Sequence, residues 1–179
     1  VIVRRKADHN PDDIRKMMAF WMKIRYGDIT GQPHYSRIKP RIIAEELLLQ
    51  DNDPSQELID YKFNCFNGMV HSCAAFSQRK QNTHDFSRML YDLDWQPHPE
   101  WLDTTRVSVA ESPKPPCYDQ MIEIARKLSA GFPYVRVDLY NISGKPIFGE
   151  MTFTPGLANH TTEFQKQLGD LIVIPPAAR

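Results

Sequence analysis

The chain has 179 residues, of which 41% are hydrophobic and 25% are charged, and its 22 Lys and Arg balance 22 Asp and Glu. This is the composition of an ordinary globular protein long enough for one well-buried core. It excludes a membrane span of about 20 consecutive apolar residues and the basic surplus typical of nucleic-acid binding. The three cysteines are widely spaced, which indicates a reducing compartment, so we expect a cytoplasmic protein without nucleic-acid partners.

The N-terminal part is predicted to form a short strand over residues 1–6, a helix, and a buried strand over residues 41–48. Asn10 is a favourable N-cap, Pro11 follows at the first helical position, and Gly27 is expected to close the helix. Apolar side chains recur within it at helical spacing, and we expect this stripe to be buried. The stripe consists of Ile14, Met17, Met18, Trp21 and Ile24.

Two alternating segments on either side of Asn67-Gly68 predict a hairpin with a type I′ turn. Counting outward from a two-residue loop assigns the side chains to two faces. The face expected in the core contains Ile59, Tyr61, Phe63, Cys65, Val70, Ala74 and Phe76. The face expected to be a cleft or a solvated surface contains Asp60, Lys62, Asn64, His71 and Cys73. On that face His71 is either a general base or a surface histidine, and Cys73 has no visible partners for a nucleophile.

The remainder of the chain alternates between helix and strand patterns, which places it in the mixed α and β class. Residues 77–116 are the least regular part. Residues 117–130 predict an amphipathic helix that ends at Gly131. Strands are expected over residues 134–140 and 146–153, and a short helix near residues 163–168 precedes an apolar strand at residues 171–174.

The last two long strands carry the residues best suited to chemistry. Side chains alternate across a strand, so Arg136 and Asp138 share one face, and Glu150 and Thr152 share a face of the returning strand. A three-residue loop containing Gly144 would place Arg136 opposite Glu150, with Asp138 diagonally beside it. Two carboxylates this close favour a divalent cation that also takes phosphate oxygens, as Mg²⁺ does. The alternative is an Arg–Glu salt bridge on a solvated face.

Residues 136–140 (Arg-Val-Asp-Leu-Tyr) and residues 149–156 (Gly-Glu-Met-Thr-Phe-Thr-Pro-Gly) resemble the end of an ATP-grasp domain. Further motifs are similar to the teichuronopeptide-biosynthesis, or TupA-like, branch of that superfamily. They lie at residues 38–46, 60–63, 65–68, 91–95, 121–128 and 131–133.

The resemblance implies the C-terminal part of an ATP-grasp fold, an α+β architecture in which helices flank an antiparallel sheet. Residues 1–48 would be the remnant of the first subdomain and residues 49–179 the second, with the nucleotide between them. The Gly-rich loop and phosphate-binding lysines of such domains precede a helix like the one at residues 11–25. We therefore expect the sequence to be a truncated piece.

The resemblance also implies roles for individual residues. Asp138 and Glu150 match the magnesium-ligating carboxylates, and Thr152 occupies the position where most ATP-grasp enzymes have Asn. Arg136 matches an arginine that steadies the transferring phosphate. Gly156 lies where backbone N–H groups would receive an acyl-phosphate or carboxylate oxygen.

Nucleotide-binding positions follow from the same resemblance. Glu45, Glu46, Leu47 and Leu48 match the hinge strand, whose backbone reads the adenine edge while an acidic side chain meets the nucleotide. Asp60 is placed like the acid that accepts from ribose hydroxyls. Lys62 shares its face and is a candidate phosphate or substrate contact.

The function implied by the resemblance is ATP-dependent carboxylate–amine ligation through an acyl phosphate, in cell-surface polysaccharide or capsule biosynthesis. The cofactors would be ATP and Mg²⁺, and the substrates a small-molecule or glycan-linked carboxylate and amine. Two alternatives remain, namely a sugar or hydroxyl kinase that uses the same site, and a non-catalytic remnant that acts as a binding module.

Overall fold

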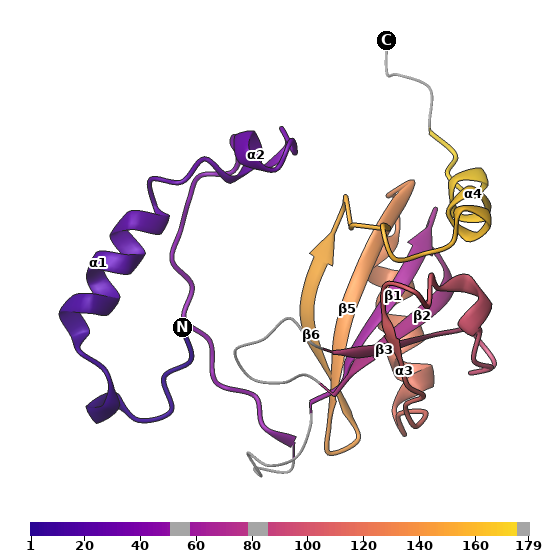
Figure 1. Cartoon of the computed structure of the whole chain (residues 1–179), viewed down its shortest axis with the longest axis horizontal. Helices are drawn as coiled ribbons and strands as arrows, with labels where there is room; N and C mark the ends of the chain where they lie inside the picture. The colour runs from indigo at the N-terminus through magenta and orange to yellow at the C-terminus, as the bar shows by residue number, and fades with distance from the viewer. Residues whose placement is uncertain (51–57, 79–85, 175–179) are drawn as a thin grey trace. The chain divides into compact units, whose positions relative to one another are not determined.

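The chain folds as two units, Val1–Leu48 and Leu49–Arg179. The structure is a computed structural model that describes residues 1–50, 58–78 and 86–174. Figure 1 shows the elements of both units. None of the helices in these ranges has the length and hydropathy of a membrane span.

The first unit contains short helices joined by irregular chain. Helix α1 (Pro11–Trp21) begins as predicted, because the side chain of Asn10 accepts a hydrogen bond of 2.9 Å from the backbone N–H of Asp12. It ends before Gly27, which lies inside α2 (Tyr26–Ile29). Two short 3₁₀ helices are found at Lys6–Asp8 and Tyr35–Arg37.

Three predictions for this unit are wrong. Residues 1–6 and 41–48 form no strand, and the apolar stripe of α1 is not buried, with Trp21 47% exposed. A strand needs a partner and an amphipathic helix needs an apolar surface, and the described residues of this unit provide neither. Glu45 and Glu46 consequently lie in an exposed segment without regular structure.

The second unit is built on a six-stranded sheet with the order β4-β3-β2-β1-β5-β6. All neighbouring strands are antiparallel except β3 and β4, which are parallel. The strands are β1 (Asp60–Phe66), β2 (Met69–Ser77), β3 (Ser87–Tyr91), β4 (Ser108–Val109), β5 (Tyr134–Ile142) and β6 (Lys145–Thr152). A mainly antiparallel sheet flanked by helices confirms the predicted α+β class.

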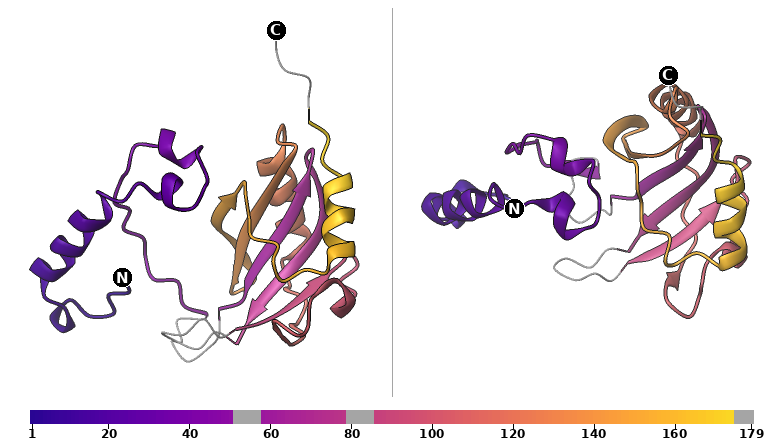
Figure 2. Two further views of the ribbon diagram at one scale, coloured as in Figure 1. Left: turned by 45° about the horizontal axis from the view of Figure 1, so that its top comes forward. Right: turned by 90° about the horizontal axis from the view of Figure 1, so that it is seen from above.

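Helices α3 (Tyr118–Ser129) and α4 (Thr162–Asp170) lie on opposite faces of this sheet (Figure 2). Both helices were predicted, α3 from its apolar periodicity. A 3₁₀ helix at Pro99–Trp101 adds to the irregular middle of the chain. The predicted strand at residues 171–174 does not form. Its side chains are 37% to 79% exposed, since no strand of the sheet pairs with them.

The β1–β2 hairpin turns as predicted but contains an irregularity beyond the turn. Asn67 and Gly68 have φ of 52° and 81°, as a type I′ turn requires. The register then shifts, so that Cys65 pairs with Val70 but Asn64 pairs with Ser72. His71 is therefore the extra residue of a β-bulge.

This bulge reverses the predicted faces for the rest of β2. Cys73 pairs with Phe63, and both side chains are fully buried in the apolar core. Ala74 and Phe76 instead share the face of Lys62. The predicted faces of Cys73, Ala74 and Phe76 are therefore wrong, because one extra residue flips every side chain that follows it. Ala74 is nevertheless buried, on the face opposite to the one predicted.

The apolar face of the sheet packs against α3 and forms the main core. Its fully buried members come from four strands and the helix, and they include Phe63, Cys73, Val135, Val137, Leu139 and Met121. A smaller cluster lies under α4 on the other face, where Phe164 and Leu168 pack against Ala74 and Leu90. The part of that face left uncovered by α4 carries the polar side chains described next.

Candidate functional site

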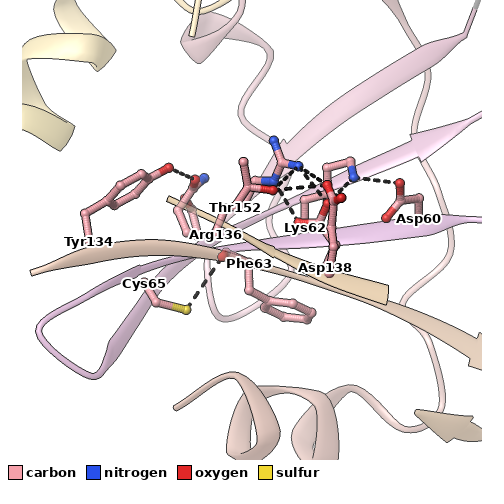
Figure 3. Close-up of polar contacts among 11 residues, drawn as sticks. Asp60, Lys62, Phe63, Cys65, Tyr134, Arg136, Asp138 and Thr152 are labelled. Carbon is pink, nitrogen blue, oxygen red and sulfur yellow. Dashed lines mark hydrogen bonds and ion pairs between the residues drawn. The ribbon is translucent and has the colours of Figure 1, made fainter. Parts of the chain in front are cut away.

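Charged side chains gather on the sheet face opposite α3. Figure 3 shows Asp60, Lys62, Arg136 and Asp138 on this side of the strands, while Phe63 points to the other side. The alternation of β1 and β5 places them there, as predicted.

A β-bulge in the second hairpin brings Glu150 to the same face. The turn has two residues, Ser143 and Gly144 with φ of 50° and 76°, not the three that were predicted. Counted from that turn alone, Glu150 would pair with Val137 and lie on the apolar face. The register instead shifts at Gly149, so that Asp138 pairs with Glu150.

The predicted neighbours within the site are therefore corrected. Arg136 pairs with Thr152, and Glu150 lies directly opposite Asp138 and not diagonal to it. Since Lys62 pairs with Asp138 on the other side, Lys62, Asp138 and Glu150 form one row across β1, β5 and β6.

Asp138 is the buried centre of this arrangement, with 1% of its surface exposed. The Nε and Nη2 atoms of Arg136 donate to its two carboxylate oxygens, each at 2.7 Å. Lys62 donates to Asp138 as well, and its Nζ lies 2.6 Å from Oδ2 of Asp60. A buried carboxylate between two cations is held in one position, and so are the cations.

Arg136 connects this centre to the edge strand β6. Its Nη2 donates to Glu150 Oε1 at 2.9 Å and to Thr152 Oγ1 at 3.0 Å, and Thr152 in turn donates to Glu150 at 3.0 Å. Burial lowers the pKa of Arg136, but the hydrogen bond and charge of Asp138 outweigh this effect and raise the pKa above its ordinary value. Arg136 therefore stays a cation, and Glu150, with a side chain 61% exposed, stays accessible from solvent.

The donor set suits a magnesium ion that keeps part of its shell for other ligands. Asp138, Glu150 and Thr152 offer only oxygen atoms, the ligand type that Mg²⁺ prefers. In the part of the chain that the structure describes, no group of three or more His, Cys, Asp or Glu could hold a metal ion. A site with two carboxylates leaves positions for water and phosphate oxygens, which is the usual arrangement for magnesium.

A pocket adjoins the charged cluster and brings in Gly156. Lys62, Arg136 and Gly156 line it, and its empty volume is about 370 Å³ with the open mouth included. A Cβ atom added at Gly156 would meet nothing within 4 Å, so packing does not require a glycine there. The structure thus brings together seven of the proposed site residues: Asp60, Lys62, Arg136, Asp138, Glu150, Thr152 and Gly156. Glu45–Leu48 belong to the other unit.

Sequence reasoning missed Arg88 and His160, which also line the pocket. The alternation in Ser87–Tyr91 could have placed Arg88 on a face of its strand, but the pairing of that strand was not predicted.

The structure weakens two other candidate catalytic residues, Cys73 and His71. Burial raises the pKa of the Cys73 thiol well above its usual range, so it is no nucleophile. His71 lies in the bulge beside the ring of Phe66 and does not pair with Asn64.

A comparison with protein families identifies the family of the chain. The model of a family described as "TupA-like ATPgrasp" matches residues 1–173, so the chain belongs to that family. None of the curated proteins matches the chain.

A solved structure to which the chain is similar is the D-alanine–D-alanine ligase from Bacillus anthracis. The sequences are 14% identical, and the match covers 64% of this chain and 38% of that one. The TM-score is 0.38. The chain thus spans well under half the length of that ligase.

Proposed function

We propose that this chain is part of an ATP-dependent carboxylate–amine ligase that works through an acyl phosphate. The observation that carries the proposal is the direct pairing of Asp138 with Glu150 on one face, joined by Arg136, in a member of the ATP-grasp family. In a member of this family, two fixed carboxylates beside fixed cations are better explained by binding of a nucleoside triphosphate with its metal ion than by a purely structural role.

Asp138, Glu150 and Thr152 would hold Mg²⁺, which when bound neutralises charge on phosphate oxygens. Arg136 is fixed by Asp138, so its guanidinium can meet a transferring phosphoryl group without losing side-chain entropy at that moment. Lys62 offers a second cation from β1. Backbone N–H groups near Gly156 would receive the acyl oxygen across the pocket.

The remaining parts of the proposal rest on the resemblance in sequence. Residues 1–48 would be the remnant of the first subdomain, and Glu45–Leu48 would contact the adenine. Asp60 would accept from the ribose hydroxyls. The reaction would serve cell-surface polysaccharide or capsule biosynthesis from the cytoplasm, with a small-molecule or glycan-linked acid and amine as substrates.

Calorimetry with Mg²⁺ and ATP tests the proposal. Glu150→Gln removes one carboxylate and should weaken Mg-ATP binding at least tenfold relative to the unaltered chain. Glu123→Gln is a matched control, because Glu123 is 57% exposed and also pairs with an arginine, Arg126 at 2.7 Å. An unaltered chain that binds no Mg-ATP, or a Glu150→Gln variant that binds it normally, would contradict the proposal.

Product analysis separates ligation from simple phosphorylation. A ligase should release phosphate together with an amide, and only when an amine is present. Phosphate transfer to a hydroxyl without any amine-dependent product would replace the ligase by a kinase.

A further inference from the structure

The carboxylate oxygens of Asp138 that a metal ion would need already accept hydrogen bonds from two cations of the chain. Oδ1 accepts from Nε of Arg136, and Oδ2 accepts from both Nη2 of Arg136 and Nζ of Lys62. A carboxylate offers about four lone-pair positions, so three of those on Asp138 are taken. Since Asp138 is also only 1% exposed, one of these donors has to move before the carboxylate can ligate a metal ion.

Arg136 is the donor that stays in place. Its guanidinium donates twice to Asp138, once to Glu150 and once to Thr152. A planar guanidinium with several partners cannot turn away from one of them without losing others.

Lys62 can leave Asp138 and still keep a carboxylate partner. Its Nζ lies between Asp138 and Asp60, at 2.6 Å from Oδ2 of Asp60 (Figure 3). The side chain of Lys62 is only 10% exposed, and a buried ammonium without a partner would be strongly destabilising. Because lysine carries a point charge on a flexible stem, a small rotation exchanges one carboxylate for the other.

The ring of Phe76 keeps Lys62 beside the pocket during such an exchange. Nζ of Lys62 lies 5.3 Å from the centre of this ring, within the range of a cation–π interaction. Lys62 and Phe76 both line the pocket. An ammonium that moves off Asp138 therefore stays at the pocket wall, where it can donate to an anionic group of a ligand.

We propose that Lys62 is an internal counterion of Asp138 that gives way to the metal ion by moving to Asp60. The chain then binds a metal ion alone only weakly, because an ammonium has to be displaced from Asp138. The phosphates of a nucleotide accept hydrogen bonds from the displaced ammonium, so metal and nucleotide bind cooperatively. This inference rests on the proposed function in assigning Asp138 as a metal ligand.

Binding of Mn²⁺ in the absence of nucleotide tests the inference. Mn²⁺, like Mg²⁺, takes carboxylate and water oxygens, and the electron paramagnetic resonance signal of the free ion measures its binding. Lys62→Gln removes the competing charge and should bind Mn²⁺ about tenfold more tightly than the unaltered chain. Asp60→Asn removes the carboxylate to which Lys62 moves, and should bind Mn²⁺ about threefold more weakly.

The opposite signs distinguish a counterion from a residue that only maintains the structure, because structural damage would weaken Mn²⁺ binding in both variants. Arg126→Gln is the matched control, since Arg126 is a half-exposed cation on α3, on the opposite face of the sheet, and its loss should leave Mn²⁺ binding unchanged. Adding Glu150→Gln to Lys62→Gln should abolish the gain, which assigns the bound ion to this site.

Thermal melting checks that each variant is folded. Lys62→Met, which is also uncharged and of similar length, replaces Lys62→Gln if that variant does not fold. If neither variant folds, Lys62 is required at Asp138 and the inference is overturned.

The inference is also overturned if the uncharged variants bind Mn²⁺ no more tightly than the unaltered chain, or if Asp60→Asn binds it equally well or better. An unaltered chain that binds Mg-ATP while Lys62→Gln shows no gain refutes only the counterion role. A gain for Lys62→Gln in a chain that binds no Mg-ATP supports the counterion role and refutes the proposed reaction instead.

Discussion

The two faces of the central sheet are built from the same strands but carry opposite kinds of side chains. The face toward α3 is apolar, and its members from β1 and β5, such as Phe63 and Val137, are fully buried. The other face carries Lys62 and Asp138, which are almost as deeply buried but charged. The difference teaches that burial on the first face stabilises the fold, whereas burial on the second mainly fixes the position of charges.

One-residue bulges decide which side chains reach which face. In β2 the bulge at His71 sends Cys73 to the core and Phe76 to the pocket. In β6 the bulge at Gly149 brings Glu150 opposite Asp138. Without either bulge, the two faces would mix polar and apolar side chains.

Removing a ring from each face should give the largest contrast in stability. Phe63→Ala on the apolar face should lower the free energy of unfolding by about 3–5 kcal/mol, because it leaves a cavity that the neighbouring side chains fill only in part. Phe76 lies on the polar face and is only partly buried, so Phe76→Ala should lower the free energy of unfolding by clearly less. Urea denaturation followed by circular dichroism measures both, and equal losses would mean that the two faces do not differ as described.

Neutralising the carboxylate of Asp138 should lower the free energy of unfolding by less than removing the ring of Phe63. Asp138→Asn leaves Arg136 and Lys62 without their shared partner, although Glu150 and Asp60 still offset part of their charge. We expect a loss of about 1–3 kcal/mol, together with the loss of Mg-ATP binding. Glu150→Gln is the comparison in the same denaturation experiment, and its half-exposed side chain should change stability by less than about 1 kcal/mol.

A methyl group at the second bulge should disturb the alignment of the two carboxylates. A Cβ atom at Gly149 would lie 3.0 Å from the carbonyl oxygen of Asp138 and 3.0 Å from the ring of Tyr140. Gly149→Ala should therefore lower stability by about 1–2 kcal/mol and weaken Mg-ATP binding.

Gly169→Ala in α4 provides the control for this substitution, because a Cβ atom there meets nothing within 4 Å. It should leave stability unchanged or raise it by up to about 1 kcal/mol. If both alanine variants behave alike, the close approach at Gly149 does not matter.

The smallest effect is expected from His71 and should appear only at acidic pH. Burial lowers the pKa of His71 from its ordinary 6.5, and within the described residues its buried Nδ1 has no hydrogen-bond partner. The unfolded chain therefore takes up this proton at higher pH than the folded chain does. The stability associated with neutral His71 is complete above pH 6.5 and declines as the pH falls toward the lowered pKa.

His71→Phe removes this contribution, and its new ring would face Phe66, Trp101 and Phe164. Unfolding free energies of the two proteins, measured from pH 8 to pH 5, should differ by an amount that grows as the pH falls below 6.5. A difference that stays constant over this range would show that His71 does not couple to folding.

Local sequence signals predicted what depends on neighbouring residues. The N-cap of α1, the amphipathic periodicity of α3 and the Asn67-Gly68 turn were predicted correctly, because they depend on contacts within a few residues. The position of Arg136 and Asp138 on one face of β5, where they form a hydrogen bond, follows from the alternation of side chains along a strand.

Features that need a distant partner were predicted less well. The strand expected at residues 41–48 and the one expected at residues 171–174 have apolar sequences, but no strand of the sheet pairs with either. The contacts of Arg88 depend on β2 and on Asn159, which lies 71 positions further along the chain.

The sequence by itself determined the family, the strand-borne carboxylates Asp138 and Glu150, and the α+β class. Only the tertiary structure decided that these carboxylates face each other, because a two-residue turn and one extra residue together set the register. A bulge leaves no reliable local signal, since its stability comes from the packing of both faces of the sheet at once.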